Sequence, residues 1–119
     1  ALVVKAERLL ASSWRLFEAP TVIRYEKDQA LARHFDANRG AEVEDANRGG
    51  QTLATLLVYL NEVSAGGRTE FNRLGLTVNP QRGQGLLFFP ATKKGEFDER
   101  VEHEGCKAED EKWIVRIWR

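Results

Sequence analysis

The chain has 119 residues, of which 42% are hydrophobic and 30% are charged, and its 18 basic and 18 acidic side chains give a formal net charge of zero. This length and composition are typical of one domain with a real hydrophobic core, and the balanced charge gives no reason to expect nucleic acid or anionic lipid as a partner. The longest apolar run, 53-LATLLVYL-60, is too short to cross a bilayer.

An amphipathic helix is predicted at the start of the chain, over 2-LVVKAERLLASSW-14. Four apolar side chains fall on one stripe of this helix: Leu2, Ala6, Leu9 and Leu10. We therefore expect the helix to cover part of the core.

After Pro20 the sequence consists of short segments rich in β-branched, Leu and aromatic residues, each bounded by Gly, Pro, Asn or Asp. The predicted strands are 21-TVIRYE-26, 51-QTLATLLVYLNEV-63, 74-LGLTV-78, 85-GLLFFP-90 and 113-WIVRIW-118. Many short strands with regular turns, after a single helix, predict a β-sandwich or jelly roll.

One long polar stretch, 36-DANRGAEVEDANRGG-50, interrupts these strands and contains the pentapeptide DANRG twice. Five residues are too few for a solenoid repeat, so a mobile loop is predicted. Long loops inside compact domains are often functional. Arg39 and Arg48 would contact a substrate if the loop folds over the site, and a solvated polar loop is the alternative.

The chain has only two histidines, and their neighbours suggest a metal site. On an extended strand, residues i and i+2 project from the same face, so His34 and Asp36 can meet one ion. His103 would complete two histidines and one carboxylate on one side of a metal, which is the facial arrangement of non-haem Fe(II) oxygenases. Because His-x-Asp alone is common by chance, ordinary core or surface histidines are the alternative.

The last predicted strand places several chemically distinct side chains on one face by its period of two: Lys112, Ile114, Arg116 and Trp118. A lysine that points into a core is costly without an anionic partner. Lys112 is therefore either a solvated residue at the end of the strand or an anion-binding residue.

Four stretches of the chain resemble the prolyl 4-hydroxylase branch of the 2-oxoglutarate- and Fe(II)-dependent oxygenases. They follow one another without large gaps: 24-RYEKDQALARHFD-36, 49-GGQTLATLLVYLNEVSAGGRTEF-71, 74-LGLTVNPQRGQGLLFF-89 and 103-HEGCKAEDEKW-113. The resemblance implies one mainly β domain over residues 1–119, a double-stranded β-helix (jelly roll) with an N-terminal helix packed against it. The helices and strand that usually precede this helix are missing, so the chain is either a minimal version or begins inside a longer domain.

The resemblance also implies the roles of individual residues. His34, Asp36 and His103 would bind Fe(II), and Lys112 would pair with the distal carboxylate of 2-oxoglutarate. Four further positions would line the cosubstrate pocket, the tyrosines as donors to that carboxylate: Tyr25, Tyr59, Thr69 and Trp118. Along the strand that carries Tyr59, alternation suggests an apolar wall made of Leu53, Thr55 and Leu57.

The implied reaction uses O2, with ascorbate as a candidate addition, to hydroxylate a proline in a peptide or protein while 2-oxoglutarate is decarboxylated to succinate and CO2. Three positions depart from the family pattern. Thr52 replaces a common Arg, and Ala37 replaces a common aromatic residue. Arg116 stands where a small hydroxyl residue is usual, and it would bind an oxo-acid carboxylate or a substrate anion, or reach solvent.

These departures leave two alternatives open, namely a 2-oxoglutarate oxygenase of a non-prolyl substrate and a jelly-roll module that binds metal without turnover. A pure binding module gives no reason to keep Lys112, which argues against the second.

Cys106 is expected to be a small packing residue, and Glu104 to point away from the metal. No signal peptide is visible, and a soluble, cytoplasmic protein is favoured without a membrane or nucleic-acid partner. A start at Ala1 and the lack of Met predict a processed or excised piece.

Overall fold

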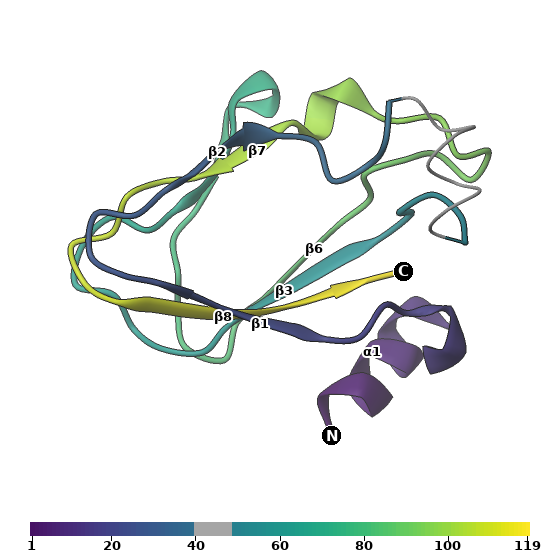
Figure 1. Cartoon of the computed structure of the whole chain (residues 1–119), viewed down its shortest axis with the longest axis horizontal. Helices are drawn as coiled ribbons and strands as arrows, with labels where there is room; N and C mark the ends of the chain where they lie inside the picture. The colour runs from purple at the N-terminus through teal and green to yellow at the C-terminus, as the bar shows by residue number, and fades with distance from the viewer. Residues whose placement is uncertain (40–48) are drawn as a thin grey trace.

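The computed structural model describes residues 1–39 and 49–119, in which two four-stranded antiparallel sheets face each other (Figure 1). One sheet has the order β1-β8-β3-β6, with strands Thr21–Tyr25, Lys112–Trp118, Thr55–Tyr59 and Gly85–Phe88. The other has the order β2-β7-β4-β5, with strands Leu31–His34, His103–Gly105, Thr69–Phe71 and Leu76–Val78. The prediction of a mainly β jelly roll with one helix is confirmed.

The hydrophobic core lies between the sheets and is formed by a cluster of buried side chains: Leu57, Tyr59, Phe71, Phe88 and Ile114. Phe71 from the second sheet packs edge to face on Phe88 from the first, with ring centroids 5.1 Å apart. Because side chains alternate along a strand, the register that turns Ile114 inward does the same for Lys112 and Arg116. Two cations of β8 therefore line the inside of the fold.

The helix α1, Leu2–Leu10, packs on the outer face of the first sheet (Figure 1). Ala6 is fully buried there against Leu56 of β3 and Ile117 of β8. Strand β3 consequently buries side chains on both faces, which explains why its sequence reads as a nearly continuous hydrophobic run.

The helix is shorter than the predicted range 2–14. It ends at Leu10, where the following residue Ala11 adopts a left-handed conformation with φ of 47°, and a short 3-10 turn, η1 (Trp14–Leu16), comes next. Leu9 is 58% exposed, so the predicted apolar stripe is wrong at that position. Among the described residues, no helix has the length and apolar character needed to span a bilayer.

Several strand boundaries also differ from prediction. Only Thr55–Tyr59 of the segment 51–63 is a strand, and the strand predicted over 74–78 begins at Leu76. The 3-10 turn η2, Asn72–Leu74, and Gly75 with φ of 63° occupy the residues before Leu76. The strand β4 was not predicted, because three residues are too few to show a hydrophobic period.

The predicted loop over 36–50 is described only in part, and Arg48 lies outside the described residues. The Arg39 guanidinium stacks on the ring of Phe35, 4.3 Å from its centroid, and lies 5.6 Å from that of Phe97. A third turn, η3 (Glu99–Val101), follows Phe97 and leads into β7. The role of Arg39 in substrate contact stays a prediction.

Candidate active site

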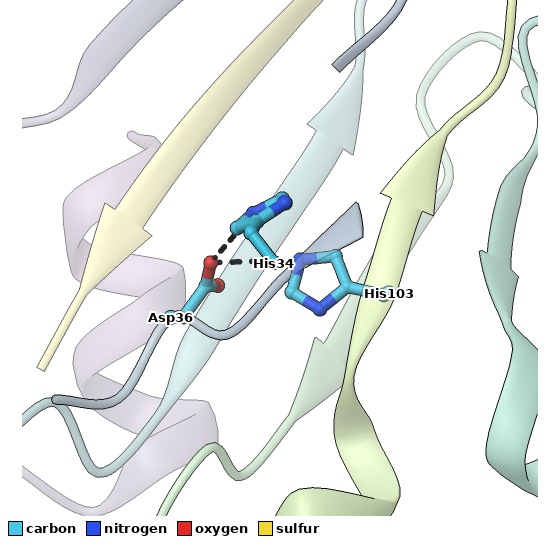
Figure 2. Close-up of side chains that lie close together, drawn as sticks. All are labelled: His34, Asp36 and His103. Carbon is cyan, nitrogen blue, oxygen red and sulfur yellow. Dashed lines mark hydrogen bonds and ion pairs between the residues drawn. The ribbon is translucent and has the colours of Figure 1, made fainter. Parts of the chain in front are cut away.

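The structure brings His34, Asp36 and His103 together where β2 and β7 pair. His34 ends β2 and lies opposite His103, the first residue of β7. The Nε2 atoms of His34 and His103 lie 3.1 Å and 3.5 Å from the same oxygen, Oδ1 of Asp36 (Figure 2). One donor atom from each residue lies within 4.8 Å of the other two, so the three side chains can share one cation.

Backbone carbonyls determine which imidazole nitrogens face the centre of this cluster. His34 Nδ1 donates to the Ala32 carbonyl at 2.8 Å, and His103 Nδ1 donates to the Val101 carbonyl at 2.9 Å. A carbonyl only accepts, so each Nδ1 carries hydrogen and each neutral ring turns the lone pair of Nε2 toward Asp36. Two lone pairs and an anionic oxygen repel each other unless a proton or a metal lies among them. This donor set fits a divalent cation that accepts imidazole and carboxylate ligands.

The pKa values of the cluster reflect the same arrangement. Burial acts to raise the pKa of Asp36, but the close approach of the His103 and His34 imidazoles and the hydrogen bond from Thr55 hold it well below its usual range. A hydrogen bond to Asp36, which Nε2 of His34 donates only when the ring is protonated, raises the pKa of His34 against the opposing effect of burial. Asp36 is therefore an anion at neutral pH, as a metal ligand must be.

Two side chains of the first sheet orient the Asp36 carboxylate. The Thr55 hydroxyl donates to Oδ2 at 2.8 Å, and the Trp118 indole Nε1 donates weakly to the same oxygen at 3.4 Å. Oδ2 is thus held by the sheet, which leaves Oδ1 facing the histidines. The sequence suggested that Thr55 belonged to an apolar wall; alternation placed its side chain on the correct face but did not reveal its hydrogen bond.

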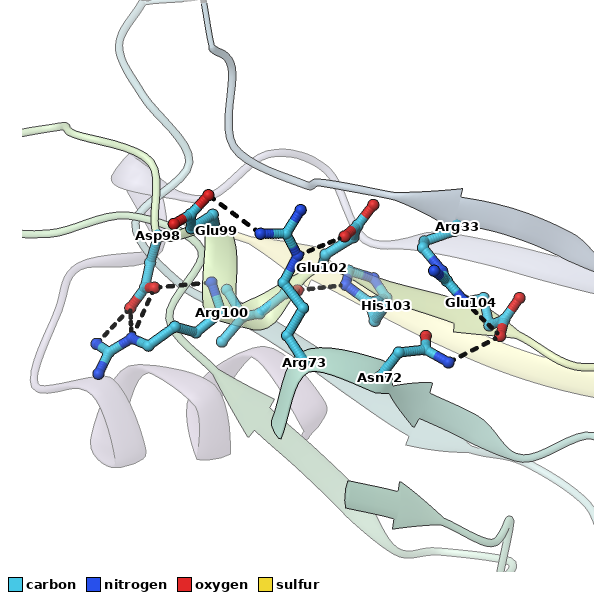
Figure 3. Close-up of polar contacts among 10 residues, drawn as sticks. Arg33, Asn72, Arg73, Asp98, Glu99, Arg100, Glu102, His103 and Glu104 are labelled. Atoms are coloured by element: carbon cyan, nitrogen blue, oxygen red, sulfur yellow. Dashed lines mark hydrogen bonds and ion pairs between the residues drawn. The ribbon is translucent and has the colours of Figure 1, made fainter. Parts of the chain in front are cut away.

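The segment that leads into His103 is held by ion pairs on the outside of the fold (Figure 3). Arg73 Nε donates to Glu102 at 2.8 Å and its Nη1 donates to Glu99 at 3.1 Å. On the outer face of β7, Glu104 accepts from Asn72 at 3.3 Å (Figure 3). Glu104 points away from the His-Asp-His cluster, as its alternation with His103 predicted.

A small cavity that is partly open to solvent adjoins the cluster. Lys112 lines it and is only 3% exposed. Its Nζ donates to the Gly67 carbonyl at 3.0 Å and lies 4.6 Å from the centroid of the Tyr25 ring. No ion pair joins Lys112 to a carboxylate anywhere in residues 1–39 or 49–119, and burial lowers its pKa. A buried ammonium with spare donors and no anion can accept an anionic group.

The other predicted pocket residues surround this lysine or the cluster. Tyr25, Tyr59 and Thr69 line the cavity, and the Tyr59 hydroxyl lies 2.9 Å from the Thr69 hydroxyl. Burial raises the pKa of both phenols, so they remain hydrogen-bond donors at neutral pH. Trp118 is not among the lining residues, and it contacts Asp36 instead.

Of the suggested apolar wall, only Leu57 lines this cavity together with Tyr59. Leu53 borders a separate depression near Leu10 of the helix, because it precedes β3 and lies outside the strand's alternation. That part of the prediction is wrong. The two positions that depart from the family pattern near the cluster, Thr52 and Ala37, are 6% and 5% exposed.

The chain belongs to the 2OG-Fe(II) oxygenase superfamily, since residues 20–119 match the profile of this family. The family implies Fe(II) and 2-oxoglutarate as cofactors, which agrees with the donor set and the buried lysine described above.

Comparisons with individual proteins confirm the resemblance to prolyl 4-hydroxylases. The chain is 30% identical over 117 residues to probable prolyl 4-hydroxylase 9 of Arabidopsis thaliana, with 85% of this chain and 40% of that protein covered. It is 33% identical over 111 residues to prolyl 4-hydroxylase 1 of the same plant, with 82% and 38% covered. It thus spans about two fifths of the length of these relatives.

The fold is also similar to a solved structure, the 2OG complex of the viral collagen prolyl hydroxylase from Paramecium Bursaria Chlorella virus-1. The TM-score is 0.85 at 26% sequence identity, and the match covers 98% of this chain and 69% of that chain.

Proposed function

We propose that this chain is the catalytic domain of an Fe(II)- and 2-oxoglutarate-dependent dioxygenase that hydroxylates a proline in a peptide or protein, with release of succinate and CO2. The observation that carries the proposal is the buried Lys112, which lines the same cavity as the His-Asp-His cluster and has no anionic partner among the described residues. A metal site alone explains the cluster, whereas an enzyme with an anionic cosubstrate explains the cluster and the lysine together.

Different residues of the chain would bind the metal and the cosubstrate. His34, Asp36 and His103 would hold Fe(II) on one side and leave three positions open. Lys112 would hold the distal carboxylate of 2-oxoglutarate, with Tyr25 and Tyr59 close by as neutral donors. The bound metal, with 2-oxoglutarate and O2, supplies the oxidising chemistry, and ascorbate is a candidate reductant. Leu57 and Ile114 make part of the cavity wall apolar, which limits water around the reacting groups.

The identity of the substrate is supported by the names of the relatives, which are prolyl 4-hydroxylases, and by the viral collagen prolyl hydroxylase of the same fold. One experiment tests both halves of the proposal: succinate release from 2-oxoglutarate by the Fe(II)-loaded chain, with and without a proline-rich peptide, and mass spectrometry of the peptide. We expect succinate and a peptide heavier by one oxygen atom in equal amounts.

A second candidate is a 2-oxoglutarate oxygenase of a non-prolyl substrate, and two observations favour it. Thr52 and Ala37 are buried and small where the family commonly has an Arg and an aromatic residue, so neither offers a comparable substrate contact. Succinate release without any change in the peptide would support this candidate. No succinate from a fully metal-loaded chain would instead indicate a module that binds metal without turnover.

A further inference from the structure

Arg116 is a second cation in the same cavity, and the roles proposed above do not use it. It lies on β8, on the same face as Lys112 and Ile114, opposite Leu57 of β3. Arg116 follows Lys112 by four positions, which places their Cα atoms roughly 13 Å apart along the strand. The two cations therefore approach the cavity from different ends of one strand.

The guanidinium of Arg116 is not neutralised within the described part of the chain. No hydrogen bond or ion pair joins it to a described residue, and its contact is with the ring of Trp118, over which its Cζ lies 3.5 Å from the centroid. Arg24, on the neighbouring strand β1, is different, because its Nε donates to Glu111 at 2.7 Å. Stacking on an indole orients a guanidinium and leaves its in-plane donors available for an anion.

Arg116 also lies at the metal end of the cavity. The indole on which it stacks donates to Asp36 Oδ2 at 3.4 Å, so Trp118 touches both the arginine and the carboxylate of the cluster. Lys112 and Arg116 thus provide one positive charge at each end of the cavity.

We infer that Arg116 is a second cosubstrate-binding residue, which donates to the carboxylate of 2-oxoglutarate next to its 2-oxo group, at the opposite end from Lys112. This inference rests on the proposed function. A dianion with a carboxylate at each end matches a cavity with a cation at each end, and the planar fork of arginine suits a carboxylate. A small hydroxyl residue at this position would supply neither the charge nor the fork.

The test is calorimetric titration of the Mn(II)-loaded chain with 2-oxoglutarate, which needs no turnover. We expect Arg116→Gln to weaken binding roughly tenfold to hundredfold, as the loss of charge-assisted hydrogen bonds does. Arg116→Lys, which keeps the charge but loses the fork, should lose less affinity and serves as the test variant if Arg116→Gln does not fold. Arg24→Gln is the matched control, because it removes an arginine from the neighbouring strand outside the cavity, and its affinity should equal that of the unaltered chain.

A second ligand separates the two ends of the cavity. 2-Oxopentanoate has the 2-oxo acid group but lacks the distal carboxylate, so Arg116→Gln should weaken both ligands by the same factor. A larger loss for 2-oxoglutarate than for 2-oxopentanoate would place Arg116 at the distal carboxylate and overturn the inference, as would unchanged binding of 2-oxoglutarate. If the unaltered Mn(II)-loaded chain does not bind 2-oxoglutarate, the proposed function itself fails.

Discussion

Two groups of three side chains in the described residues have donor atoms close enough to share a cation: His34, Asp36 and His103, and Glu70, Glu104 and Cys106. The second group is already balanced, because Glu70 pairs with Arg68 and Glu104 lies 3.7 Å from Arg33. Burial also raises the pKa of Cys106, which keeps it a thiol and a poor ligand. In the first group, two imidazole lone pairs face a buried carboxylate. Proximity of donor atoms alone therefore does not define a metal site. The donors must also be oriented toward one point and lack a neutralising partner.

Removal of one carboxylate from each group should give the largest difference in Mn(II) affinity. Asp36→Ala removes the only anion of the first group and should weaken Mn(II) binding by more than about 100-fold, beyond the loss expected for an outer partner. Glu104→Ala, on the outer face of β7, is the control and should leave the affinity unchanged. Calorimetric titration with Mn(II) measures both. A loss in Glu104→Ala with unchanged affinity in Asp36→Ala would mean that the second group binds the metal.

The next largest effect is expected at Lys112, the buried cation that lines the cavity next to the first group. Lys112→Met keeps most of the side-chain volume and removes the charge, so 2-oxoglutarate affinity should fall by about 10- to 100-fold. The same change should raise the free energy of unfolding of the ligand-free chain by about 1 kcal/mol, because a buried charge without an anion is costly. Titration calorimetry and urea unfolding measure the two effects, and a fall in both would show that Lys112 is a structural residue.

A smaller effect on Mn(II) affinity is expected when the Asp36 carboxylate loses one of its hydrogen bonds. Thr55→Val has nearly the same shape but cannot donate to Oδ2, so Mn(II) affinity should fall by about tenfold, as it does when an outer hydrogen bond to a ligand is lost. Thr77→Val on the exposed strand β5 is the matched control. Unchanged Mn(II) affinity in Thr55→Val would mean that Trp118 alone orients Asp36.

The smallest effect is a pH dependence of stability. Burial lowers the pKa of Lys112 below 10.5, so at alkaline pH the folded chain loses this proton before the unfolded chain does. Between the lowered pKa and 10.5 the unfolded state binds more protons, and stability should rise with pH. The stability advantage of Lys112→Met over the unaltered chain should therefore shrink across this window in urea unfolding. An advantage that stays constant with pH would mean that Lys112 is not desolvated in the folded state.

Local sequence patterns were sufficient for the helix, for five of the strand segments and for the face of β8 that carries Lys112 and Arg116. Alternation and amphipathicity are properties of neighbouring residues, so they can be read without knowledge of the fold. The pairing of His34 with Asp36 was predictable for the same reason, since only one residue separates them. The early end of the helix at Leu10, the three-residue strand β4 and the misplaced Leu53 were not predictable, because each depends on how a short segment meets its neighbours in space.

By itself the sequence determined a β-rich domain, a His-x-Asp pair and a strand with two cations on one face. Only the tertiary structure decided that His103 meets that pair across β2 and β7, that Thr55 holds Asp36, and that Lys112 is buried without an anion among the described residues. The physical reason is that hydrogen bonds and desolvation depend on distances between segments far apart in the chain, which a local pattern does not contain.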